Sequence, residues 1–257
     1  MPPLSDATWQ NLWETVSTLS GTALPQPVVT GWTPPDRPLA ALIDHTLLAP
    51  TATPADISRL TAEARAWQTA AVCVNPAYVA QVARELAGSS VLVATVAGFP
   101  LGSGTPAATA YEAHEAVQRG AAEVDMVIAL GALKAGRWHE VLHHLRVVRD
   151  AVPPPLRLKV ILETGLLTDE EKALGALLAA AAGADFVKTS TGFLGGGATE
   201  ADVALLRRAV GPHLGVKASA GIRARADALA LVAAGADRLG TSRTAAILGV
   251  SPMEVAR

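Results

Sequence analysis

Short apolar runs alternate with longer amphipathic segments along most of the chain. From Leu39 onward, the runs are rich in Val, Ile and Leu, and the segments between them carry apolar positions at helical spacing. Eight runs are predicted to be strands: Leu39–Leu48, Ala70–Asn75, Val91–Phe99, Glu123–Leu130, Leu156–Thr164, Ala184–Thr191, Leu214–Gly221 and Asp237–Ser242. Such alternation is typical of repeated strand–helix units around a parallel sheet.

The predicted helices have recognisable first and last residues. Thr53 and Thr168 each precede acidic residues in a first turn, where a hydroxyl caps free N–H groups and acids suit the helix dipole. Gly120, Gly183 and Gly235 each end a helix, and glycine readily adopts the left-handed conformation that stops one. The repetition indicates one structural unit reused around a ring. Eight such units in about 220 residues predict a (β/α)8 TIM barrel.

A doubly wound open sheet is the main alternative to the barrel. That fold would have a glycine-rich dinucleotide-binding turn after an early strand, whereas the first predicted strand continues into Asp44-His-Thr-Leu-Leu-Ala-Pro50. Ahead of the barrel, residues 5–20 carry apolar positions at helical spacing, and Pro25–Pro38 is rich in Pro, Gly and Thr. We therefore expect an N-terminal helix and linker over residues 1–38 and a barrel domain over residues 39–257.

Composition and charge favour small-molecule chemistry. The chain has 257 residues, a net charge of -2 and no basic run, so nothing predicts nucleic acid or an anionic membrane as a partner. No apolar stretch reaches the roughly 18 residues of a membrane-spanning helix. Cys73 is the single cysteine, which excludes an internal disulfide and a cysteine-cluster metal site. These features predict a cytoplasmic protein.

Charged residues interrupt predicted strands whose inward positions should be apolar or small. Five of them stand out as candidates for inward positions: Asp125, Lys159, Glu163, Lys188 and Lys217. Lys159 and Glu163 are four residues apart, so the strand period of two would point both side chains to one face. We expect this acid to balance this base.

Lys188 and Lys217 each lie in an apolar stretch, one strand–helix unit apart. A buried lysine without a partner tends to lose its proton, and a second cation within about 4 to 6 Å lowers its pKa further. The neutral amine is a nucleophile of the kind that forms Schiff bases. The alternative is that each lysine ends an edge strand and extends into water. Phe186, Val187 and Val216 argue against it, because they leave little room for a solvated face.

Asp125 has two interpretations. It lies two strands before Lys188, where it can move protons between water and a Schiff-base intermediate. It can also be the ion-pair partner of a neighbouring lysine, because buried charges are usually paired. The two roles are compatible.

Two loops of small residues predict a phosphate site. Ser219–Arg223 and Gly240–Arg243 follow the seventh and eighth predicted strands, where barrels often bind phosphate. Their glycines let backbone N–H groups approach an anion, and their hydroxyls add donors. Gly192 and the glycines at 195–197 offer a further wall.

Seven sequence blocks closely resemble the deoxyribose-phosphate aldolase family, which are class I aldolases with a (β/α)8 fold. The resemblance runs from about Leu39 to Leu248 and rests on Ile43-Asp-His-Thr-Leu-Leu, Ala71-Val-Cys-Val-Asn-Pro, Val93-Ala-Thr-Val-Ala-Gly-Phe-Pro, Glu123-Val-Asp-Met-Val-Ile, Leu158-Lys-Val-Ile-Leu-Glu-Thr, Phe186-Val-Lys-Thr-Ser-Thr-Gly-Phe and Gly215-Val-Lys-Ala-Ser. It implies that Lys188 forms the Schiff base, that Lys217 lowers its pKa and moves protons, and that Asp125 is the proton-relay acid. It also implies that the substrate phosphate is held by Thr191, Gly192, Gly221, Gly240 and Ser242.

The implied reaction is the reversible cleavage of 2-deoxy-D-ribose 5-phosphate into D-glyceraldehyde 3-phosphate and acetaldehyde. No metal or other cofactor is implied, and we expect a homodimer or homotetramer. One alternative is a Schiff-base enzyme for another short aldehyde or phosphosugar. Another is a catalytically silent barrel that binds a sugar phosphate as a sensor, because fold alone does not prove function.

The chain departs from the family's usual pattern in the phosphate loops. Where two glycines are usual after Lys217, it has Ala220-Gly221, and a positive φ at Ala220 would cost roughly 1 to 2 kcal/mol. Where a second serine is common after Ser242, it has Arg243, which either grips the phosphate or points outward.

Overall fold

The barrel predicted from the sequence is present and closed. The structure, a computed structural model, describes residues 3–24 and 32–252. Parallel strands pair in sequence order, and the last pairs with the first to close the ring. They are β1 (Ile43–Leu47), β2 (Ala71–Val74), β3 (Leu92–Ala97), β4 (Glu123–Val127), β5 (Arg157–Ile161), β6 (Phe186–Lys188), β7 (Gly215–Ser219) and β8 (Arg238–Thr241). All eight predicted strands are confirmed, each shorter than its apolar run.

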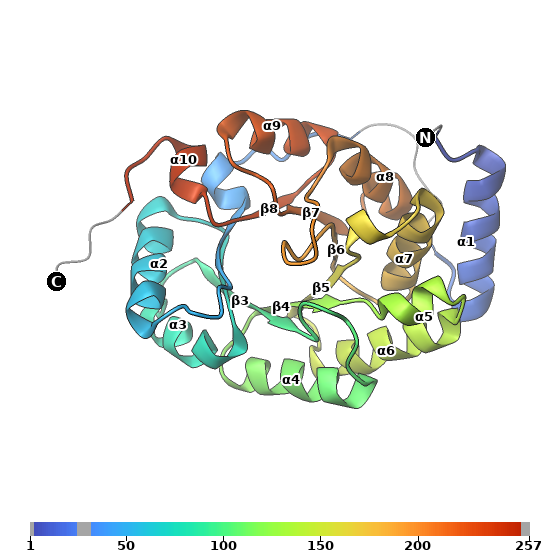
Figure 1. Cartoon of the computed structure of the whole chain (residues 1–257), viewed down its shortest axis with the longest axis horizontal. Helices are drawn as coiled ribbons and strands as arrows, with labels where there is room; N and C mark the ends of the chain where they lie inside the picture. The colour runs from blue at the N-terminus through green and yellow to red at the C-terminus, as the bar shows by residue number, and fades with distance from the viewer. Residues whose placement is uncertain (1–2, 25–31, 253–257) are drawn as a thin grey trace.

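Helices cover the outside of the barrel (Figure 1). They are α1 (Asp6–Ser20), α2 (Pro54–Trp67), α3 (Val79–Glu85), α4 (Pro106–Gln118), α5 (Leu130–Lys134), α6 (Trp138–Ala151), α7 (Asp169–Ala181), α8 (Glu200–Val210), α9 (Arg225–Ala234) and α10 (Thr244–Leu248), with short 3-10 turns η1 (Leu39–Leu42), η2 (Pro76–Tyr78) and η3 (Thr164–Leu166). From α2 to α10 they follow one another anticlockwise in Figure 1, except that the short helix α5 lies beyond α6, beside α7. Because strand–helix–strand units are right-handed, this order places the carboxyl ends of the strands toward the viewer. The (β/α)8 prediction is confirmed, and the doubly wound sheet is wrong.

Local signals set the helix boundaries. Thr53 and Thr168 accept hydrogen bonds from the N–H groups of Asp56 and Glu171, and both acids bond back to the capping residue. Positive φ angles occur at the three predicted helix stops, Gly120, Gly183 and Gly235. The predicted start of the first strand is wrong by four residues. Residues 39–42 form η1 instead, because Pro38 accepts a turn hydrogen bond from the N–H of Ala41 at 2.9 Å.

The N-terminal helix α1 packs on the outside of the barrel beside α7 (Figure 1). Trp9 and Val16 are buried in the main apolar core, and Trp13 donates its indole N–H to the carbonyl of Leu24 at 3.1 Å. The predicted N-terminal helix is confirmed, and part of the predicted linker Pro25–Pro38 lies outside the described residues. Among the residues that the structure describes, no helix is long and apolar enough to cross a membrane.

Candidate active site

Asp125 binds three lysines inside the barrel. Its Oδ1 accepts a hydrogen bond from Lys159 Nζ at 2.7 Å, and its Oδ2 accepts from Lys188 at 2.9 Å and Lys217 at 2.6 Å. The strand register sets Asp125 beside Lys159, and Lys188 beside Lys217. Lys188 is 3% and Lys217 1% exposed. The alternative of edge-strand lysines extended into water is therefore wrong.

Further charged side chains, which the sequence analysis missed, complete this buried cluster. Asp44 Oδ2 lies 2.5 Å from Lys217 Nζ, and Asp44 Oδ1 accepts a hydrogen bond from Arg238 at 2.6 Å. Glu123 Oε2 lies 2.7 Å from Lys159 Nζ and accepts from Arg238 at 3.2 Å. Arg238 thus joins the two outer carboxylates.

The alternation of inward and outward side chains along each strand could have identified these residues from the sequence. Glu123 is two residues before Asp125 in β4 and therefore shares its inward face. In the same way, Arg238 is two residues before Gly240, and Asp44 is two residues before Thr46. Gly240 and Thr46 both line the cavity described below, so each pair marks an inward face.

The buried cluster contains one more cation than it has carboxylates. Its members are Asp44, Glu123, Asp125, Lys159, Lys188, Lys217 and Arg238. An unbalanced charge in a protein interior is costly, and a buried amine can avoid that cost by losing its proton. The cluster is therefore neutral when one lysine is neutral.

The pKa shifts identify that lysine as Lys188. Burial lowers the pKa of Lys188, Lys217 lowers it further, and Asp125 offsets only part of this effect. Burial also acts on Lys217, but Asp125 and Asp44 raise its pKa above the ordinary value. The pKa of Lys159 is raised as well, because Asp125 and its neighbouring carboxylates outweigh burial. Burial raises the pKa of Asp125, yet the three ammonium groups hold it well below its usual range.

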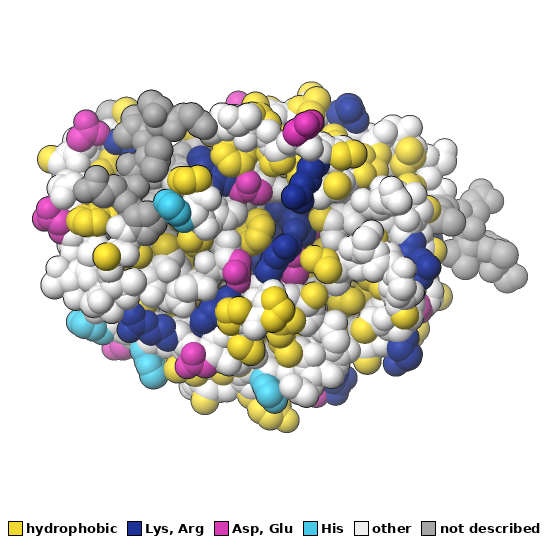
Figure 2. All heavy atoms as spheres, turned by 180° about the vertical axis from the view of Figure 1, so that it is seen from behind, with side chains coloured by type: hydrophobic (Ala, Val, Ile, Leu, Met, Phe, Trp, Pro, Cys, Tyr) yellow, Lys and Arg dark blue, Asp and Glu magenta, His cyan; other side chains and the backbone are white. Residues whose placement is uncertain are grey.

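The amino ends of the strands connect this cluster to the surface. Glu123, Arg157 and Arg238 begin β4, β5 and β8, and Arg157 donates to Glu123 at 2.9 Å from a side chain that is partly exposed. Figure 2 views the molecule from behind and shows Lys and Arg side chains gathered in a hollow at the centre of that face. Glu123 is thus shared between a buried lysine and a surface arginine.

Glu163 does not balance Lys159, so that expectation is wrong. Strand β5 ends at Ile161, and the backbone of Glu163 is left-handed, with a φ of 56°. The strand period of two no longer applies at such a residue. The buried carboxylate accepts the N–H of Thr191 at 3.0 Å instead. It therefore ties the chain after β5 to the loop after Lys188.

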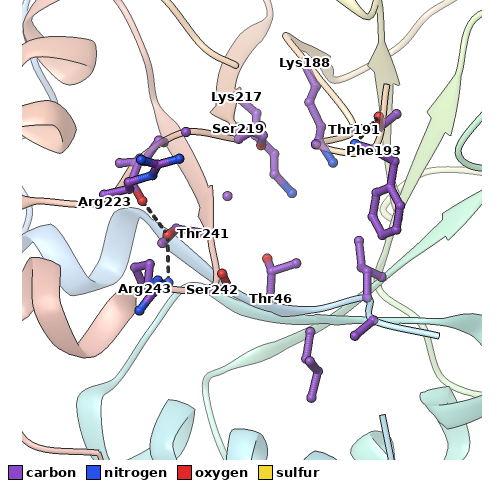
Figure 3. Close-up of a pocket in the computed structure, with 18 of the residues that line it drawn as sticks. Thr46, Lys188, Thr191, Phe193, Lys217, Ser219, Arg223, Thr241, Ser242 and Arg243 are labelled. Atoms are coloured by element: carbon purple, nitrogen blue, oxygen red, sulfur yellow. Dashed lines mark hydrogen bonds between the residues drawn. The ribbon is translucent and has the colours of Figure 1, made fainter. Parts of the chain in front are cut away.

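A cavity of about 650 Å³ opens beside Lys188 and Lys217 (Figure 3). All five residues predicted to hold phosphate line it: Thr191, Gly192, Gly221, Gly240 and Ser242. The lining also includes Arg223 and Arg243, but it contains no Asp or Glu among the described residues. An anion that enters this cavity therefore meets the charges of Lys217, Arg223 and Arg243, beside the amine of Lys188, and no acidic side chain among the described residues. Within the same described part of the chain, no three His, Cys, Asp or Glu side chains are grouped to hold a metal ion.

Two small residues shape the wall of this cavity. A Cβ at Gly240 would lie 3.0 Å from Lys217 Cε and would clash with Ser219 Oγ. Glycine at this position therefore leaves room for the Lys217 side chain. Ala220 has a φ of 71°, which is the strained conformation expected of alanine at this position. The strain costs roughly 1 to 2 kcal/mol.

The chain is similar to known aldolases over most of its length. Residues 39–249 match the family described as DeoC/LacD family aldolase. Deoxyribose-phosphate aldolase 1 of Bacillus licheniformis is 51% identical over 212 residues, which cover 82% of this chain and 95% of the relative. The deoxyribose-phosphate aldolase of Carboxydothermus hydrogenoformans is 54% identical over 213 residues, covering 82% and 93%.

Solved structures show the same fold. A putative deoxyribose-phosphate aldolase from Coccidioides immitis superposes with a TM-score of 0.83 at 39% identity, covering 97% of this chain and 98% of that one. The deoxyribose phosphate aldolase from Aeropyrum pernix, which is described as tetrameric, has a TM-score of 0.76 at 31% identity and covers 96% and 97%.

Proposed function

The chain belongs to the DeoC/LacD aldolase family, and we propose that it reversibly cleaves 2-deoxy-D-ribose 5-phosphate into D-glyceraldehyde 3-phosphate and acetaldehyde. The observation that carries this proposal is the set of three lysines on Asp125, of which only Lys188 has a lowered pKa. The relatives named for this activity support the choice of substrate.

Lys188 is the nucleophile. Its neutral Nζ adds to the aldehyde carbon of the open-chain sugar, and the resulting carbinolamine loses water to form a protonated imine. The imine accepts the electron pair of the C2–C3 bond as that bond breaks, and the C3 hydroxyl gives up its proton, so glyceraldehyde 3-phosphate leaves. The enamine that remains gains a proton at carbon, and hydrolysis then releases acetaldehyde and restores the amine.

Lys217 and Asp125 serve the proton transfers. The raised pKa of Lys217 keeps it protonated at neutral pH, so it can donate a proton to the carbinolamine hydroxyl that leaves as water. Asp125 Oδ2 accepts hydrogen bonds from both amines, which places its charge beside the imine on Lys188. The carboxylate stabilises that cation and relays protons between Lys217 and water.

The phosphate binds at the end of the cavity formed by the loops after β6, β7 and β8. Thr191, Gly192, Gly221, Gly240 and Ser242 hold it through backbone N–H groups and hydroxyls. Their place in the lining supports this role, and so does the lack of acidic residues among the described residues that line the cavity.

Other properties of the enzyme are part of the same proposal. Residues 1–38 form a helix and linker outside the barrel domain of residues 39–257. The enzyme is a homodimer or homotetramer, in keeping with the tetrameric relative from Aeropyrum pernix. It acts in the cytoplasm on small molecules, without a metal, nucleic acid or membrane as partner.

Turnover and chemical trapping test the proposal together. The enzyme should release acetaldehyde and glyceraldehyde 3-phosphate from deoxyribose phosphate, and acetaldehyde with borohydride should leave a two-carbon adduct on Lys188. An adduct on another residue, or none, would refute the Schiff-base chemistry. An adduct without turnover of deoxyribose phosphate would favour another aldehyde substrate. Tight phosphosugar binding with neither adduct nor turnover would favour the silent sensor.

A further inference from the structure

Two arginines lie at one end of the cavity: Arg223, whose backbone N–H donates to Asp227 at 3.0 Å and whose charge also contributes to lowering the pKa of that carboxyl, and Arg243. Arg223 follows β7 and Arg243 follows β8, and both line the cavity. Neither guanidinium forms an ion pair with a carboxylate within the described residues. Figure 3 shows both arginines on one side of the cavity, and Lys188 and Lys217 elsewhere on its wall. A guanidinium with free donors is well suited to bind phosphate through two parallel hydrogen bonds.

The backbone of Arg243 is held in place although its side chain is exposed. Its N–H donates to Thr241 Oγ1 at 2.9 Å, and the same hydroxyl donates to the carbonyl of Ile222 at 3.0 Å (Figure 3). On its other side, Thr244 Oγ1 lies 2.8 Å from Nδ1 of the buried His45. The guanidinium therefore extends from a fixed base that joins the loops after β7 and β8.

Ser219 is an independent sign that a ligand binds here. Its side chain is only 5% exposed, it lines the cavity, and its hydroxyl has no hydrogen-bond partner among the described residues. A buried hydroxyl without a partner costs free energy that a ligand oxygen would recover. The cavity therefore has a hydrogen-bonding group without a partner beside Lys217, in the wall that continues along the chain to Arg223.

We propose that Arg243 is a specificity-determining residue that, together with Arg223, selects sugars with a phosphate monoester over unphosphorylated sugars. This inference rests on the proposed function and deepens it. The second pKa of a phosphate ester is about 6, so two guanidiniums select the dianion that predominates at neutral pH. At the position of Arg243, where the family commonly has a serine hydroxyl, this chain has a charged guanidinium. Phosphate binding should therefore depend more steeply on salt than it would with a hydroxyl.

Arg243→Ser tests the inference against a matched control, Arg225→Ser. Arg225 is exposed at the start of α9 and does not line the cavity. We expect Arg243→Ser to lower the ratio of kcat/KM for deoxyribose phosphate to kcat/KM for deoxyribose by about tenfold, as expected for a charge-assisted hydrogen bond. The control should retain the ratio. Arg243→Lys, which keeps the charge without the planar fork, should fall between the two.

Binding of inorganic phosphate, measured by calorimetry, gives a second readout that needs no turnover. The dissociation constant should rise about tenfold in Arg243→Ser and remain at the parent value in Arg225→Ser. An unchanged constant together with an unchanged specificity ratio would overturn the inference. If the parent did not turn over deoxyribose phosphate but still bound phosphate through Arg243, the proposed function would fail, whereas the assignment of Arg243 as a phosphate-binding residue would stand.

Discussion

The two ends of the cavity differ in how their charged side chains are balanced. Around Lys188, the carboxylates and amines are buried, and Asp125 alone accepts hydrogen bonds from three amines. At the phosphate end, Arg223 and Arg243 are exposed, and neither guanidinium forms an ion pair with a carboxylate in the described part of the chain. At the buried end, the protein's own carboxylates and amines set one another's protonation states. At the phosphate end, the ligand supplies the negative charge that balances the arginines.

This difference teaches how reactivity and recognition are separated. Burial and the neighbouring Lys217 lower the pKa of Lys188, so the chemistry depends on the charges that surround this lysine inside the barrel. The arginines are exposed to solvent, and removing one should change binding without disturbing those charges. Substitutions at the buried end should therefore impair catalysis, and substitutions at the phosphate end should impair binding.

Removal of the nucleophile should have the largest effect. Lys188→Ala should reduce turnover by about 10⁴-fold or more, because no other amine with a lowered pKa lies on Asp125. Steady-state kinetics measures the loss, and Lys134→Ala, at an exposed lysine on α5, is the matched control. Substantial residual turnover in Lys188→Ala would break the assignment.

Removal of the neighbouring cation should change both rate and pH dependence. Lys217→Leu should lower kcat by about 100-fold, because a proton donor is lost. It should also raise the pKa of Lys188, because Lys217 contributes to lowering it. The rate rises with pH as Lys188 loses its proton, so this rise should move to higher pH in the variant. A pH–rate profile that kept its midpoint would contradict the pairing.

The free energy of unfolding should depend on whether the substituted cation is paired, as Arg238 is with two carboxylates, or is the one in excess, Lys188. Arg238→Met leaves Asp44 and Glu123 without their shared partner and should lower the free energy of unfolding by about 3 kcal/mol or more. Lys188→Met removes the unbalanced cation and should change that free energy by less than about 1 kcal/mol. Urea unfolding monitored by circular dichroism measures both. Equal losses in the two variants would refute the charge balance.

The smallest effect is expected at Ala220. Ala220→Gly should raise the free energy of unfolding by about 0.5 to 1 kcal/mol, since relief of the positive φ exceeds the added entropy of the unfolded chain. Ala218→Gly, two residues earlier in β7, is the control and should destabilise the protein, because a buried methyl group is lost. A loss of stability in Ala220→Gly would show that this position carries no strain.

The sequence predicts the fold and the buried lysines for the same physical reason. Each strand is a local apolar run, and a lysine within such a run is conspicuous, as at Lys188 and Lys217. Pairing is harder to predict because it depends on register between strands. Glu163 was expected to balance Lys159, but the chain leaves β5 before Glu163, and the partners of Lys159 come from β1 and β4.

At the phosphate end, the sequence predicts the position of the cavity but not the ion pairs of its charged side chains. Small residues at strand ends predict where a cavity opens, and all five predicted residues line it. The positive φ of Ala220 also follows from the glycine that usually occupies that position. That no carboxylate among the described residues forms an ion pair with Arg243 could not be predicted, because it depends on which acidic side chains reach the loop.

The most direct test of the central claim is the pH dependence of trapping at Lys188. The enzyme would be mixed with acetaldehyde and borohydride over a range of pH, and mass spectrometry of peptides would give the rate of adduct formation at each lysine. We predict that the adduct forms at Lys188 with a midpoint clearly below the ordinary lysine pKa of about 10.4. A midpoint at the ordinary value, or an adduct on Lys217, would contradict the account.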